Sequence, residues 1–176
     1  MATTKPTFAK MGLKINTEVK TVMIGEQEVE VKQYLPVNDK LTLIGNVISF
    51  AADENNFSNP IKLDVFTALE IVFTYTNLSF TEKQKEDLIK LYDILESNGV
   101  FSQILSAMNE TELKFICDGV EKCSNAIYTY RNSVMGIIDS ISGEYGALSL
   151  NASEIQEKLA DENNLALLRN ILTKLG

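Results

Sequence analysis

The chain of 176 residues contains no histidine and no tryptophan. Histidine supplies the base of Ser-His-Asp triads and Cys-His dyads, and it is a ligand in most zinc sites. Its absence excludes these kinds of site from this polypeptide.

Glycine-rich phosphate loops are missing as well. Gly143 and Gly146 stand closest to such a pattern, but with Glu-Tyr between them they resemble a helix-ending turn. They match neither G-x-x-x-x-G-K-[ST] nor G-x-G-x-x-G, the spacings that let backbone amides surround a phosphate.

Clustered carboxylates in apolar surroundings, which general acid–base catalysis requires, are hard to find. Acidic pairs such as Asp87 and Asp93 lie among lysines and indicate a solvated helix face. We therefore expect a protein that is not an enzyme and has no catalytic residue, no cofactor and no metal. The alternative from the enzyme class is a metal-dependent hydrolase that uses Asp53, Glu54 and Asp64.

Positive charge is scarce, with 16 basic against 24 acidic residues, a net charge of −8 and a pI near 4.6. Residues 1–40 carry six lysines and five acids, net +1, which leaves −9 for residues 41–176. A nucleic-acid binder needs a basic face for phosphates, so we expect no nucleic-acid partner.

No long uninterrupted apolar run is present. The most apolar window, residues 61–80, contains Lys62, Asp64 and Glu70, each costly at bilayer depth, so we expect no membrane partner. No basic segment followed by an apolar one opens the chain, and we expect a cytoplasmic protein. The two cysteines, Cys117 and Cys123, point about 240° apart on a helix and are predicted to be buried free thiols.

The residues that are present predict a mainly α protein with one β-hairpin. Residues 1–18 have no strong period and indicate an N-terminal arm, with a short helical turn near Phe8. Residues 19–24 and 27–35 alternate as strands around Gly25-Glu26, a two-residue hairpin loop. The predicted register gives the hairpin one apolar face, formed by Val22, Ile24, Val29 and Val31.

Helical patterns with capping residues follow Pro36. They predict a single helical domain over residues 19–176, a helical bundle that includes the hairpin at 19–35. Helices are expected over about 38–51, 61–75, 81–98, 100–108 and 109–142, followed by two short ones. Apolar residues recur on average every 3.5 positions from Leu113 to Ile141, the coiled-coil period.

Two surfaces are candidates for binding another protein. One is the apolar hairpin face with its exposable strand edges, and the other is the group Tyr128, Tyr130 and Arg131 on the long helix. Tyrosine and arginine are common hot-spot residues, although Tyr130 also fits the apolar seam and core packing stays open. We expect self-association or a partner complex; the alternative is a single chain that buries both surfaces.

The order of elements resembles small morphogenesis proteins of tailed bacteriophages, above all tail assembly chaperones, the lambda G-like proteins. The likeness lies in the passage from strand to helix, Glu28-Val-Glu-Val-Lys-Gln-Tyr-Leu-Pro36 and Asn38-Asp-Lys-Leu-Thr-Leu-Ile44. It implies a chaperone in the host cytoplasm that binds tape measure and tail tube proteins during virion assembly.

Two other functions stay open. The segment after Ser149 is longer than is usual in such chaperones, which leaves a viral structural protein of the head, neck or connector, present in the virion and bound to capsid or neck proteins. The negative charge of residues 41–176 also permits another function. The protein would be an inhibitor that mimics the charge of a nucleic acid and binds a host defence complex in its place.

Overall fold

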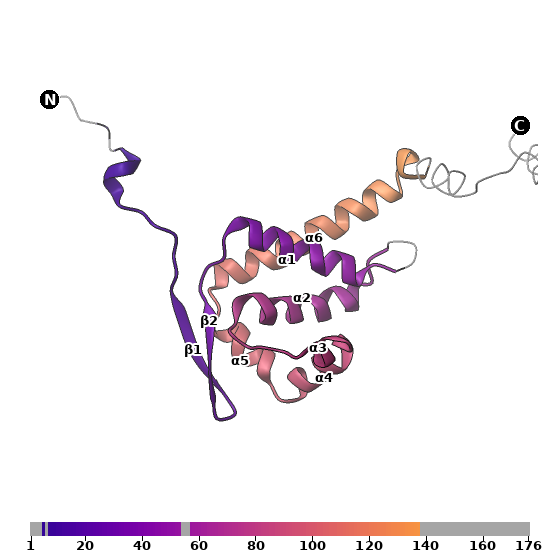
Figure 1. Cartoon of the computed structure of the whole chain (residues 1–176). Helices are drawn as coiled ribbons and strands as arrows, with labels where there is room; N and C mark the ends of the chain where they lie inside the picture. Colours follow the sequence, from indigo (N-terminus) through magenta and orange to yellow (C-terminus); the bar gives the residue numbers. More distant parts are fainter. Residues whose placement is uncertain (1–4, 6, 54–56, 138–176) are drawn as a thin grey trace, which may run out of the picture. The chain divides into compact units, whose positions relative to one another are not determined.

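The computed structural model describes residues 5, 7–53 and 57–137, and the chain divides into the units Met1–Tyr128 and Thr129–Gly176. The described residues confirm a mainly α fold with one antiparallel hairpin (Figure 1). The elements are a 3-10 helix η1 (Phe8–Met11), strands β1 (Val19–Ile24) and β2 (Gln27–Lys32), and helices α1 (Val37–Ala51), α2 (Pro60–Tyr75), α3 (Glu82–Lys85), α4 (Leu88–Ser97), α5 (Val100–Ala107) and α6 (Glu110–Arg131). The expected single domain over 19–176 extends past the described residues and stays a prediction.

The hairpin has the predicted register, with Val22 opposite Val29 and Lys20 opposite Val31. Gly25 adopts a φ of 62°, which side chains with a Cβ rarely tolerate. The turn residue and the alternation of apolar positions therefore fix the pairing together.

The apolar face of the hairpin lies on the helices of the same chain. Val29 and Val31 are 1% and 0% exposed, and Val22 and Ile24 are half-buried against the core. Behind them the core continues through α1, α2, α4, α5 and the first half of α6. This packing supplies the apolar partner that a two-stranded hairpin needs to be stable in water.

One expected helix starts elsewhere, and another is divided in two. Helix α1 begins at Val37 after Pro36, not at a cap formed by Asn38 or Asp39, because Pro36 already holds the extended backbone that precedes a helix. The expected helix over 81–98 is two helices. Thr81 and Gln84 form the predicted capping box, but α3 ends at Lys85 and Asp87 caps α4 with its own carboxylate.

The long helix predicted over 109–142 is wrong in length, because α6 ends at Arg131. Ser133 donates its hydroxyl to the carbonyl of Tyr130 and accepts from the amide of Gly136, so it caps a new helical turn at residues 134–137. Ile116 and Val120 of the predicted seam are buried, whereas Cys123 and Tyr130 are exposed. Ile141 lies outside the described residues.

Candidate functional site

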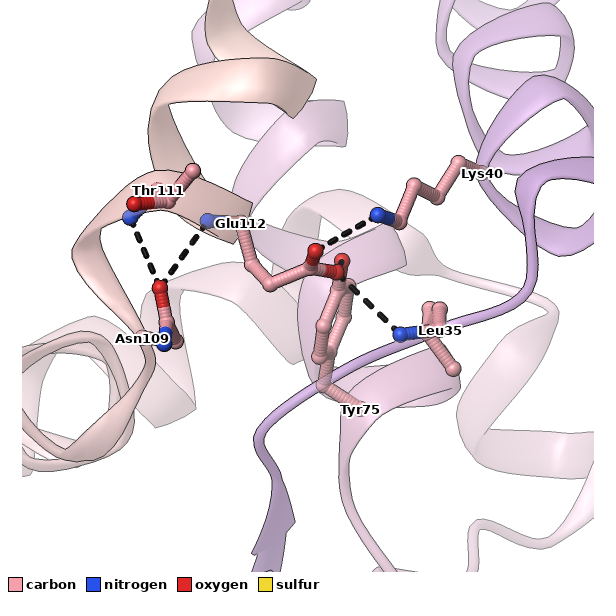
Figure 2. A network of polar contacts seen from close by, with 6 residues as sticks. All are labelled: Leu35, Lys40, Tyr75, Asn109, Thr111 and Glu112. Atoms are coloured by element: carbon pink, nitrogen blue, oxygen red, sulfur yellow. Dashed lines mark hydrogen bonds and ion pairs between the residues drawn. The ribbon is translucent and has the colours of Figure 1, made fainter. Parts of the chain in front are cut away.

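A network of polar contacts centres on the carboxylate of Glu112, in the first turn of α6 (Figure 2). Asn109 begins this helix, and its side-chain oxygen accepts from the amides of Thr111 and Glu112 at 2.9 and 3.4 Å. That cap satisfies amides that have no partner within the helix. The cap also orients Glu112 toward the interior.

Three donors surround the Glu112 carboxylate. Oε1 lies 2.6 Å from Nζ of Lys40 on α1, and Oε2 accepts from the amide of Leu35 at 3.1 Å and the hydroxyl of Tyr75 at 3.0 Å (Figure 2). Leu35 precedes α1 and Tyr75 ends α2. A single carboxylate thus joins the end of the hairpin segment, α1, α2 and α6.

Lys40 is enclosed by aromatic rings as well as by the carboxylate. Its ammonium lies 4.4 Å from the centroid of Tyr34 and 4.9 Å from that of Phe115, distances at which cation–π attraction operates. The sequence patterns considered above did not predict this pair. A signal was present, because Lys40 precedes Leu43, Ile44 and Val47 at helical spacing and therefore lies on the apolar stripe.

Tyr75 is fully buried and donates its hydroxyl to Glu112. Burial, the negative charge of Glu112 and the hydrogen bond to it raise the pKa of the Tyr75 phenol well above its usual value. The phenol therefore stays protonated and serves as a donor. Because the buried Glu112 carboxylate receives an ammonium, an amide and a hydroxyl together, we assign this cluster to holding the elements in place.

A second buried acid, Glu70 on α2, faces α1. Its Oε2 accepts from the side-chain amide of Asn46 at 3.1 Å. Burial raises the pKa of Glu70, and the Asn46 hydrogen bond lowers it by a smaller amount. This single amide donor offsets only part of the cost of burying the ionised carboxylate of Glu70.

The carboxylates of the hydrolase alternative do not come together in the described residues. Asp53 accepts from the amide of Phe57, Asp64 is exposed on α2, and Glu54 lies outside the described residues. Within residues 5, 7–53 and 57–137, no group of three acidic or cysteine side chains could hold a metal ion.

The prediction of buried thiols is wrong, because Cys117 and Cys123 are both free and exposed. Both are exposed positions of α6, whereas Ile116 and Val120 of the same helix are buried. Because of their spacing on α6, Cys117 and Cys123 point in different directions from the helix axis, as expected.

The predicted partner-binding residues divide into two groups. Val29 and Val31 belong to the core, so a partner could reach them only if the hairpin left the helices. Tyr128 and Tyr130 are 62% and 51% exposed, and Arg131 is half-buried. Partner binding by these residues stays a prediction.

The two edges of the hairpin differ. On β2, Glu30 donates its amide to the side chain of Asn77 at 3.0 Å and accepts from the Asn77 amide at 3.3 Å, and Val31 bridges Thr76. The segment after α2 therefore covers this edge. On β1, the register directs the amides and carbonyls of Val19, Thr21 and Met23 away from β2. No other strand of the described residues pairs with β1.

No family model, curated protein or solved structure matches the chain. Within the described residues, no helix combines the length and apolar character needed to cross a bilayer.

Proposed function

We propose that this chain is a non-enzymatic phage assembly protein, a tail assembly chaperone that acts in the host cytoplasm and binds tape measure and tail tube proteins. The observation that carries the proposal is the open edge of β1, with the outward amides and carbonyls of Val19, Thr21 and Met23. The phage partners come from the resemblance of residues 28–44 to lambda G-like proteins.

An open strand edge binds an extended segment of another protein through main-chain hydrogen bonds. Val19 and Met23 are 43% and 53% exposed beside that edge, so an added strand would also contact apolar side chains. The edge is held rigidly, because β2 is paired on its far side by Asn77 and is packed on the helices through Val29 and Val31. A preformed edge reduces the entropy cost of binding.

Substitution of Thr21 tests the use of this edge. The Thr21 amide points outward, so Thr21→Pro removes one donor for a partner strand while the hydrogen bonds within the hairpin remain. Thr21→Val is the matched control, since it keeps the amide. Each variant of the whole chain is co-expressed with tape measure and tail tube proteins, and complexes are measured by size-exclusion chromatography with light scattering.

We expect wild type and Thr21→Val to form the complex and Thr21→Pro to bind at least about tenfold more weakly, with unchanged circular dichroism. Equal binding by Thr21→Pro and wild type would show that the partner does not bind through the edge of β1. A complex only with portal or capsid proteins would favour the viral structural protein, and salt-sensitive binding to a host nuclease would favour the inhibitor.

A further inference from the structure

A groove lies between α2 and α6, on a different part of the molecule from the open edge of β1. It encloses about 560 Å³ and is lined by half-buried apolar side chains, among them Leu63, Leu105 and Leu113. Asp64 and Glu121 also line it, and no lysine or arginine does. The groove is thus apolar inside with acidic side chains at its wall.

Cys117 is another residue that lines the groove. Partial burial of the thiol and the carboxylates of Asp118 and Asp64 raise the pKa of Cys117. Of these two carboxylates only Asp64 lines the groove, so Asp64 and Glu121 are the charges that suit its wall to a positively charged segment.

The N-terminal arm has the complementary chemistry. From residue 5 to residue 17 the chain carries three lysines and no acid. The arm also exposes large apolar side chains, namely Phe8 at 73%, Met11 at 52%, Leu13 at 65% and Ile15 at 68%. Four large apolar side chains exposed between Phe8 and Ile15 indicate a surface that another protein covers.

Length and periodicity match as well. The α2 residues that line the groove run from Pro60 to Ile71, about 17 Å along a helix axis. Five extended residues span the same length. Met11 ends the 3-10 helix η1 and Gly12 has a φ of 63°, so docking as an extended segment requires this turn to open. Once residues 11–15 are extended, Met11, Leu13 and Ile15 alternate with Gly12 and Lys14 and lie on one side.

We propose that the arm segment Lys10–Ile15 of one copy docks in the α2–α6 groove of a second copy, with Lys10 and Lys14 near Asp64 and Glu121. The arm of the same copy is not seated there, since residues 7–20 are all exposed, and in Figure 1 the arm leaves the hairpin without turning over the helices. Residues 138–176 are less suitable occupants, because six acids and three bases give them a net charge of −3.

Native Cys117 allows a direct test by disulfide cross-linking. Leu13→Cys is introduced into the full-length chain, which is oxidised with O₂ and a copper catalyst at pH 9 and run on a non-reducing gel. We expect a covalent dimer that persists with Cys123→Ser and disappears with Cys117→Ser. A monomer that has lost two thiols would show docking within one copy, and absence of any cross-link would exclude the groove; both results overturn the proposal.

Complementation between two defective variants provides an independent measurement. Leu13→Asp disables the arm and Asp64→Arg disables the groove, and both positions are exposed, so both variants should fold. We expect each alone to raise the dissociation constant of self-association about tenfold or more by light scattering, and an equimolar mixture to recover a heterodimer through its one intact arm and groove. A mixture that stays monomeric would overturn exchange between copies. Thr21→Pro should leave cross-linking unchanged, so this proposal and the proposed function fail separately.

Discussion

The carboxylate of Glu112 lies 2.6 Å from the ammonium of Lys40, and the two side chains are 9% and 8% exposed. The residues are 72 positions apart in the chain. Loss of one partner from such a buried pair leaves the other charge uncompensated.

Lys40→Met should therefore lower the free energy of unfolding by about 3–5 kcal/mol, measured by urea denaturation. The matched control is Lys85→Met, which breaks the pair of Lys85 with Glu82, 3.4 Å apart with side chains 47% and 90% exposed. We expect that control to cost under about 1 kcal/mol. Equal losses from the two variants would contradict a structural role for the buried pair.

Tyr75→Phe removes one donor to the Glu112 carboxylate without changing the volume of the core much. We expect it to lower the free energy of unfolding by about 1.5–3 kcal/mol at pH 7, the usual size for a hydrogen bond to a charged group. Tyr92→Phe, at a half-buried residue whose ring contact with Phe101 a phenylalanine keeps, serves as control and should change stability by less than about 0.5 kcal/mol.

The same variant should change stability in alkali. Because the pKa of Tyr75 is raised in the folded protein, the unfolded chain loses this proton first, near pH 10. The protonated Tyr75 phenol makes its full contribution to the free energy of unfolding below pH 10, and this contribution falls as the pH rises further. Between pH 9.5 and 11.5 the unfolding midpoint of wild type should fall more steeply than that of Tyr75→Phe; parallel slopes would refute the assignment.

Glu70→Gln should stabilise the protein at neutral pH. Burial raises the pKa of Glu70, so the unfolded chain releases this proton more readily, and stability falls as the pH rises through the folded pKa. A glutamine is neutral throughout and can still accept from Asn46. The urea midpoint of Glu70→Gln should exceed that of wild type at pH 7 and match it at pH 4. An identical difference at both pH values would mean that ionisation is not the cause.

Gly119 of α6 approaches α1 closely, and a Cβ there would lie 2.5 Å from Cδ1 of Ile44. Gly119→Ala alone should lower the free energy of unfolding by about 1 kcal/mol, because the cost of overpacking against Ile44 exceeds the gain in helix propensity. Ile44→Val removes the conflicting methyl group. The double variant should be at least about 1 kcal/mol more stable than the sum of the single changes predicts, and additive unfolding energies would contradict this contact.

The sequence by itself determined the hairpin and most of the helices. Gly25 and the alternation of Val22, Ile24, Val29 and Val31 are local signals, and they predicted the observed register. The capping box at Thr81 and the cap at Asn109 were local too. Such signals act between residues that are close in the sequence, so they depend little on how the rest of the chain packs.

Only the tertiary structure decided how polar groups far apart in the chain meet. Glu112 had the spacing of a capping-box residue, but Leu35, Lys40 and Tyr75 give its carboxylate stronger partners. Asn77 closes one edge of the hairpin across 47 residues, and the edge of β1 is left open. These outcomes depend on which buried donors and acceptors lie within about 3 Å after the helices pack, and sequence spacing carries no measure of that distance.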